Sequence, residues 1–184
     1  MAIAENMKIS FYYFQWNYRK EKVLRHDGKL YVVSPWAVIR DNEKCYLLAY
    51  DREAGVMKHY RIDKMKKVCL VDESREGKEI YEKENMASYS KRYFGMFHGT
   101  PTKVHFLLKE YMIDVFIDRF GLDINFQKTS DSVYPYKTCI DVIVSGKFFG
   151  WVWSLGNGVK IEGPDNVIND FMSKNNSVEE LYAK

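Results

Sequence analysis

The feature that most constrains the fold is a series of short strand-like runs with turn-rich breaks between residues 8 and 72. The five runs are KISFYYFQWN, LYVVSPWAVIR, KCYLLAYD, VMKHYRI and MKKVCLVD. The breaks HDGK, RDNEK, DREAG and IDK have the residue types and lengths of connections between antiparallel strands. Because closure removes exposed sheet edges, the pattern predicts a small β-barrel. Pro35 lies within the second run, which predicts an edge position or a bend at a barrel corner.

The second half alternates strand-like and helix-like segments. Strands are predicted in TKVHFLLK, DINFQKT, YKTCIDVIV and GVKIEG, and helices in EYMIDVFIDRFG, GKFFGWVWSLG and PDNVINDFMSK. This βαββαβ order followed by a helix is the ferredoxin-like signature. The helical spacing predicts that Trp153 shares an apolar side with Phe149 and Val152, and that Met172 faces inward.

The expected fold class is therefore α+β, a small β-barrel followed by a ferredoxin-like domain. We expect the barrel in residues 1–72, a charged linker and a short helix in 73–99, and the ferredoxin-like domain in 100–184.

The composition supports packed cores, with 46% hydrophobic and 16% aromatic residues. Cys45, Cys69 and Cys139 lie far apart in apolar runs, which predicts small core residues in a reducing compartment. Their spacing does not match a zinc site, and no metal or cofactor is expected. A signal-peptide pattern and a membrane-length apolar run are absent from the sequence, so we expect a cytoplasmic protein with no membrane partner.

Charge is distributed unevenly along the chain. Residues 8–67 contain 14 Lys and Arg against 7 Asp and Glu, whereas residues 84–184 contain 11 against 12. A basic first half favours an anionic partner, and a solvated basic face explains it equally well. The sequence lacks G-x-S-x-G and H-E-x-x-H, and its four histidines lie apart, so we do not expect an enzyme.

The strongest candidate site is the hairpin KCYLLAYDREAGVMKHYRIDKM. Along its second strand His59 and Arg61 share a face, and Lys64 follows within one turn of chain. An Arg and a Lys at a strand end, beside the ring and hydroxyl of Tyr46, can hold a phosphate. Ser34, just before the proline, adds a hydroxyl donor. The alternative is that the tyrosines are core residues and Arg61 caps the barrel.

This stretch resembles the WYL family of bacterial transcriptional regulators. In VSPWAVIRDNEKCYLLAYDREAGVMKHYRIDKMKKV, Pro35 matches the family proline and Cys45-Tyr46-Leu47 matches Trp-Tyr-Leu. Arg61 and Lys64 match the family's two basic residues, with lysine where arginine is usual. The segment FFGWVWSLGNGVKIEGPDNVINDF is similar to the C-terminal extension that follows WYL domains.

The resemblance implies an Sm-like barrel of the SH3 type that senses an anionic or nucleic-acid-like ligand. It also implies a homodimer formed through the C-terminal extension and an attached winged helix-turn-helix domain. Because nothing in the sequence has a helix-turn-helix pattern, we expect that domain N-terminal to this chain. Three hypotheses follow: an effector-binding module, a single-stranded nucleic-acid-binding module, and a structural dimerisation unit. The first assigns the ligand, a small anion or a single-stranded nucleic acid, to Tyr46, Arg61 and Lys64, with Ser34, His59 and Arg25 as weaker candidates.

Overall fold

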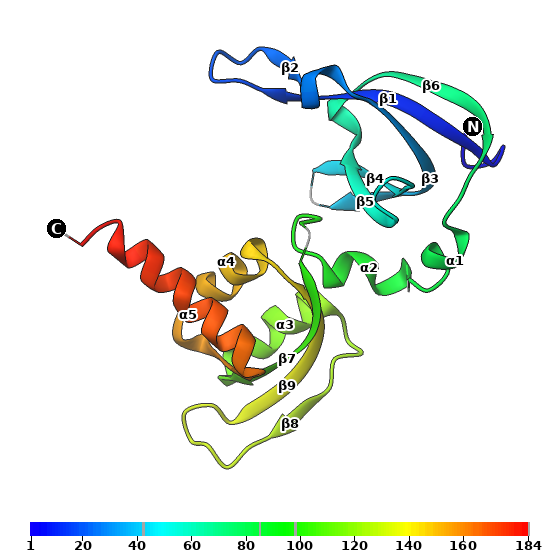
Figure 1. Cartoon of the computed structure of the whole chain (residues 1–184). Helices are drawn as coiled ribbons and strands as arrows, with labels where there is room; N and C mark the ends of the chain where they lie inside the picture. Colours follow the sequence, from blue (N-terminus) through cyan, green and yellow to red (C-terminus); the bar gives the residue numbers. More distant parts are fainter. Residues whose placement is uncertain (42, 85, 98, 184) are drawn as a thin grey trace. The chain divides into compact units, whose positions relative to one another are not determined.

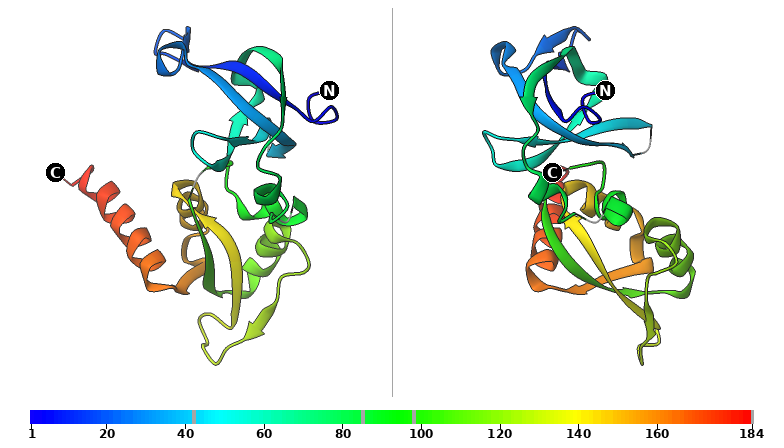
Figure 2. Two further views of the ribbon diagram at one scale, coloured as in Figure 1. Left: turned by 45° about the vertical axis from the view of Figure 1, so that its right-hand side comes forward. Right: turned by 90° about the vertical axis from the view of Figure 1, so that its right-hand side faces the viewer.

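A computed structural model describes the chain except for residues 42, 85, 98 and 184. The chain divides into two compact units, Met1–Ser90 and Lys91–Lys184, each built on its own antiparallel sheet (Figure 1, Figure 2). The protein is therefore of the mixed α+β class. Among the described helices, none is long and apolar enough to cross a membrane.

The first unit contains every strand predicted before residue 74, and one more. Its elements are β1 (Met7–Trp16), β2 (Lys22–Leu24), η1 (His26–Gly28), β3 (Leu30–Asp41), β4 (Lys44–Asp51), β5 (Val56–Arg61), η2 (Ile62–Lys64), β6 (Met65–Ser74) and α1 (Lys78–Tyr81), and α2 (Met86–Arg92) crosses into the second unit. The sheet order is β2-β1-β3-β4-β5, and β6 also pairs with β1. The short strand β2 was not predicted, because three residues carry too little alternation to be recognised.

A closed barrel was predicted for this unit, and the sheet of the described residues is open. Among those residues no ladder joins β5 to β6, because η2 turns the chain so that β6 pairs antiparallel with β1. Pro35 lies in β3 beyond the ladder with β1, which ends at Val33, and pairs only with Ala49 of β4, so its own position is at an edge as predicted. The register shifts between Pro35 and Ala37, and this bulge accommodates the missing N–H of the proline.

The core of the first unit follows from strand alternation. One face of the sheet buries a cluster of aromatic and aliphatic side chains, namely Ile9, Phe11, Tyr13, Val33, Leu47, Ala49 and Tyr60. The rings of Phe11 and Tyr31 stack with centroids 5.4 Å apart, and Tyr60 meets Phe11 edge-on at 5.2 Å. Aromatic pairs in these arrangements stabilise a core beyond the area they bury.

The second unit contains β7 (Thr100–Leu108), η3 (Glu110–Met112), α3 (Ile113–Phe120), β8 (Phe126–Lys128), β9 (Tyr136–Val144), α4 (Gly146–Ser154), η4 (Gly156–Gly158), β10 (Val159–Gly163) and α5 (Asp165–Glu180). The strand order is β10-β7-β9-β8, entirely antiparallel. The hydroxyl oxygen of Ser145 accepts the backbone N–H of Phe148 at 3.3 Å and caps the start of α4.

Some predicted core positions are exposed. Phe149 and Val152 are buried in α4 as predicted, but Trp153 is 70% exposed, and Met172 of α5 is 51% exposed. Trp151, on another side of α4, packs against the core instead. In each helix, therefore, fewer apolar residues face the core than the sequence pattern predicts.

All three cysteines are exposed, so their prediction as core residues was wrong. Cys45 pairs across the ladder with Arg40, and Cys139 with His105 of β7. An apolar run in a half-buried strand still sends every second residue to solvent. The cysteines occupy those outward positions.

Candidate ligand-binding site

The candidate site lies where β4 begins and β5 ends. The ladder pairs Tyr46 directly with Arg61, and Leu47 directly with Tyr60. Leu47 and Tyr60 enter the core, so Tyr46 and Arg61 lie together on the other face. Directly opposed side chains of an antiparallel pair are close enough to interact. The strand register therefore brings together the first two predicted ligand residues.

Arg61 is held by two neighbours. Its backbone N–H donates to the hydroxyl of Tyr13 at 2.9 Å, which ties the end of β5 to β1. Its guanidinium donates twice to Asp63, from Nε to Oδ1 at 3.0 Å and from Nη2 to Oδ2 at 2.6 Å. This bond raises the pKa of Arg61 and lowers the pKa of Asp63. The guanidinium is already in the fork geometry that binds a carboxylate or a phosphate.

Tyr46 and Lys64 complete the predicted set. Tyr46 is half-buried, and burial raises the pKa of its hydroxyl despite the opposing charge of Arg61. The phenol is therefore a neutral hydrogen-bond donor at physiological pH. Lys64 ends η2, which lies against β4. Within the described chain no ion pair engages its ammonium group.

The structure places His59 and Arg25 differently. His59 shares its face with Arg61, but its Nε2 lies 3.0 Å from the hydroxyl of Tyr89 on α2. Arg25 donates its backbone N–H to the carbonyl of Tyr13 at 2.8 Å, and its guanidinium lies 6.0 Å from that ring. Tyr13 therefore connects Arg25 and Arg61, whereas His59 is directed to the helix.

Ser34 lies at the opposite end of the β3–β4 ladder. It pairs with Tyr50, whereas Tyr46 pairs with Ile39, five residues further along β3. At about 3.3 Å per residue this separates Ser34 from Tyr46 by roughly 15 Å. The Ser34 hydroxyl is buried and accepts the backbone N–H of Glu76 at 2.9 Å. Ser34 therefore belongs to a different group of bonded residues, which includes Glu76.

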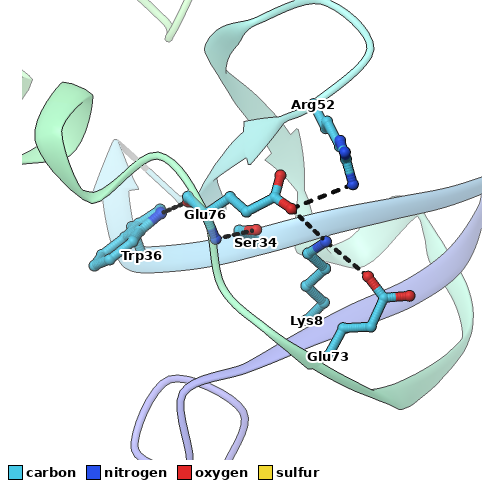
Figure 3. A network of polar contacts seen from close by, with 6 residues as sticks. All are labelled: Lys8, Ser34, Trp36, Arg52, Glu73 and Glu76. Atoms are coloured by element: carbon cyan, nitrogen blue, oxygen red, sulfur yellow. Dashed lines mark hydrogen bonds and ion pairs between the residues drawn. The ribbon is translucent and has the colours of Figure 1, made fainter.

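That second group joins β1 and β3 to the segment after β6 (Figure 3). The ammonium of Lys8 is bonded to Glu73 at 2.8 Å and to Glu76 at 3.0 Å. Arg52 reaches the same Glu76 carboxylate at 3.4 Å. The indole of Trp36, at the bulge of β3, donates to the Glu76 carbonyl at 2.8 Å. The backbone N–H, the carbonyl and one carboxylate oxygen of Glu76 are thus engaged, and the start of the segment predicted as a linker is bonded to the sheet.

A cavity of about 220 Å³ opens beside this network. Its lining includes both signs of charge, contributed by Lys8, Lys29, Arg52, Asp51, Glu53 and Glu73. Asp51 is nearly buried and accepts from Lys58 at 2.6 Å and from the Tyr60 hydroxyl at 3.1 Å. The mixed lining does not select for an anion.

Sequence reasoning missed Tyr13 and Asp63. Tyr13 alternates inward with Phe11, and this pattern indicates a core position but not that its hydroxyl reaches Arg61. Asp63 lies between the two basic residues of RIDK, and an acidic residue at that position could have predicted an ion pair with Arg61. Its bond to Arg61 means that any incoming anion competes with a carboxylate of the protein itself.

Comparison with known proteins finds a match for the part of the chain that contains this site. Residues 1–70 match the family model of the WYL domain. A crystal structure described as a CRISPR Cas-related protein is similar with a TM-score of 0.52 and 13% identity, over 98% of this chain and 48% of that chain. Proteasome accessory factor B/C (PafBC) of Arthrobacter aurescens is similar with a TM-score of 0.38 and 15% identity, over 90% of this chain and 24% of that one.

The chain thus spans less than half of each of these two structures. A comparison with curated proteins found no match. At 13% identity the likeness to the CRISPR Cas-related protein shows a shared fold alone. The part of the chain that contains Tyr46, Arg61 and Lys64 is similar to the WYL domain.

Proposed function

We propose that this chain is the effector-binding part of a transcriptional regulator, and that it binds an anionic ligand at Tyr46, Arg61 and Lys64. The observation that carries this proposal is the direct pairing of Tyr46 with Arg61 at a partly exposed strand end. Arg61 would bind a phosphate or carboxylate, Tyr46 would donate its hydroxyl or stack, and Lys64 would add positive charge. The WYL match over residues 1–70 supports a sensing role that acts on a DNA-binding domain.

The finer fold assignment is part of the same proposal. The order β6-β1-β3-β4-β5 supports an Sm-like arrangement of the first unit, left open between β5 and β6. The element order β7-α3-β8-β9-α4-β10 and the sheet order β10-β7-β9-β8 support a ferredoxin-like second unit.

The test is calorimetric titration of the chain with a nucleoside 5′-monophosphate and with the matching nucleoside. The parent should bind the monophosphate, and Arg61→Ala should lower its affinity tenfold or more. Arg61→Lys should recover part of the loss, because it restores charge but not the fork. Arg52→Ala is the matched control, since it removes the same charge from the other end of the same hairpin. Equal losses in Arg52→Ala and Arg61→Ala would contradict a site at Arg61.

We further propose that the second unit forms a homodimer through α4 and α5. Trp153 is 70% exposed and lines two adjacent apolar cavities. One, of about 470 Å³, lies between α4 and α5, and the other, of about 640 Å³, is also lined by β10. Light scattering should find a dimer for the parent and a shift toward monomer for Trp153→Ala. A monomeric parent across the accessible concentration range would exclude this arrangement.

A further inference from the structure

The hairpin of β1 and β2 presents aromatic side chains on the face turned away from the core. Phe11 and Tyr13 point into the core, so Tyr12, Phe14 and Trp16 lie on the opposite face of β1. Phe14 is 3% exposed, and Trp16 packs edge-on against it with centroids 5.5 Å apart. Trp16 itself is 54% exposed. A buried ring thus supports an exposed one at the end of the strand.

Lysines from two different strands converge on these rings. Lys22 pairs with Trp16 across the β1–β2 ladder, and its ammonium lies 5.4 Å from the indole centroid. The same ammonium lies 4.8 Å from the centroid of Phe14. On the other side, Lys66 of β6 pairs with Tyr12 and lies 5.5 Å from the Phe14 centroid. The buried ring is therefore flanked by two cations.

A distortion of β6 adds a third cation to this face. Lys67 has a φ of 52°, a conformation that is costly for a side chain of this kind, and the β1–β6 register shifts between Ser10 and Tyr12. In a regular strand Lys66 and Lys67 would point to opposite faces. Here the ammonium of Lys67 lies 5.9 Å from the ring of Tyr12. Bulges on edge strands commonly redirect a side chain in this way.

The tip of the hairpin is held in one shape. The side-chain oxygen of Asn17 accepts the backbone N–H groups of Arg19 at 3.0 Å and of Glu21 at 2.9 Å. On this turn Tyr18 is 87% exposed, with the guanidinium of Arg19 at 5.3 Å from its ring. A second exposed aromatic ring thus stands next to a cation, and little ordering is required on binding.

The charge of this region is strongly one-sided. Residues 12–25 and 65–68 contain a single carboxylate, that of Glu21, and six cations: Arg19, Lys20, Lys22, Arg25, Lys66 and Lys67. Figure 1 shows the hairpin extending away from β4 and β5, and the rings concerned face away from the core that contains Tyr13. Exposed aromatic rings alternating with cations are the features that bind unpaired bases and their phosphates.

We propose that the surface of this hairpin and the adjoining part of β6, made of Trp16, Tyr18, Arg19, Lys22, Lys66 and Lys67, binds single-stranded nucleic acid. Trp16 and Tyr18 stack on unpaired bases, and the lysines contact phosphates. The surface uses neither Tyr46 nor Arg61, so it goes beyond the effector site proposed above. A single strand is favoured over a duplex, because bases inside a duplex do not offer their faces to Trp16 and Tyr18.

The test is fluorescence anisotropy of a labelled oligothymidylate against the full chain, at low and at physiological ionic strength. The double variant Lys22→Ala/Lys66→Ala should lower affinity tenfold or more at low salt. Because each phosphate contact on a single strand contributes about 0.7 to the slope of log affinity against log salt, the slope should fall by roughly 1.4. Lys103→Ala/Lys137→Ala is the matched control, since it also removes two exposed strand lysines.

Trp16→Ala should lower the affinity by about tenfold, and Trp16→Phe should recover part of it, which separates stacking from folding. Arg61→Ala should bind the oligonucleotide like the parent, so the hairpin surface and the Arg61 site are tested independently. The proposal is overturned if the parent does not bind, or if the control pair loses as much affinity as Lys22→Ala/Lys66→Ala. It is also overturned if only Arg61→Ala weakens binding, or if a duplex of the same length binds as tightly as the single strand.

Discussion

The two polar groups of the first unit, at opposite ends of the β3–β4 ladder, use similar residues for different purposes. At one end, the Lys8 side chain is 6% exposed and bonded to two carboxylates (Figure 3). At the other end, the Arg61 side chain is 30% exposed and bonded to one carboxylate, itself 50% exposed. A buried cation with two partners is costly to disturb, whereas an exposed pair is weak and its partner can be exchanged.

The comparison explains why the excess of basic residues did not by itself locate a site. Lys8 and Arg52 belong to the basic half of the chain, but their charges are directed to Glu73 and Glu76. Arg61 differs because its only carboxylate partner among the described residues, Asp63, is local and exposed to solvent. A candidate site for an anion is therefore marked by a basic side chain whose carboxylate partner can be replaced, and not by the number of basic residues nearby.

The largest effect should come from breaking the buried group. Lys8→Ala is expected to lower the free energy of unfolding by about 2–3 kcal/mol, because it removes a buried side chain and its two charge-assisted hydrogen bonds to Glu73 and Glu76. Urea unfolding followed by circular dichroism measures this loss. Lys29→Ala is the control: Lys29 forms an exposed pair with Glu53, and its removal should lower the free energy of unfolding much less than Lys8→Ala does. Equal losses for both variants would contradict the distinction between a buried cation and an exposed ion pair.

Removing the internal competitor should strengthen binding. Asp63→Asn frees the Arg61 fork and is expected to raise the affinity for a nucleoside monophosphate by about three- to tenfold. Calorimetric titration measures the change. The control is Asp63→Asn made in the Arg61→Ala background. If Asp63 weakens binding only by competing for the guanidinium, the gain in affinity should disappear there, whereas a general charge effect would leave the gain unchanged. Persistence of the gain in that background would refute the competitor role.

Arg61→Ala should have little effect on folding. Its ion pair with Asp63 is local and exposed, so the free energy of unfolding should fall by less than about 1 kcal/mol. The backbone N–H that donates to Tyr13 survives the substitution. A loss as large as that of Lys8→Ala in the same urea experiment would assign Arg61 to barrel structure, as in the alternative considered for the hairpin.

The smallest effect concerns pH. Burial acts to raise the pKa of Asp51, but hydrogen bonds from Lys58, Ala54 and Tyr60 outweigh it and lower that pKa. A lowered folded-state pKa stabilises the protein above the unfolded value of about 3.9, and this stability is lost as pH falls through the folded-state pKa. The stability difference between the parent and Asp51→Asn, about 1 kcal/mol at pH 7, should therefore shrink on acidification below about pH 4. A difference that stays constant down to pH 3 would contradict this role of Asp51.

Much of the first unit was predictable from local pattern. The alternation of KCYLLAYD and VMKHYRI correctly placed Arg61 on the face opposite Tyr60, and the tight breaks correctly indicated antiparallel neighbours. The hydrophobic pattern gave wrong burial where the exposure of a side chain depends on which other element packs against its strand or helix. The cysteines were expected inside and are outside, and Trp153 was expected in the core and is 70% exposed.

The sequence by itself determined the five longer strands of the first unit and the opposite faces of Tyr60 and Arg61, because these depend on residues a few positions apart. The pair of Arg61 with Asp63 is equally local, although it was not predicted. Tertiary structure decided the bond from Arg61 to Tyr13, 48 residues away, and the bonds from Lys8 to Glu73 and Glu76, 65 and 68 residues away. It also decided that β6 pairs with β1 and leaves the sheet open. These features depend on the register between distant strands, and alternation along one strand carries no information about its partner.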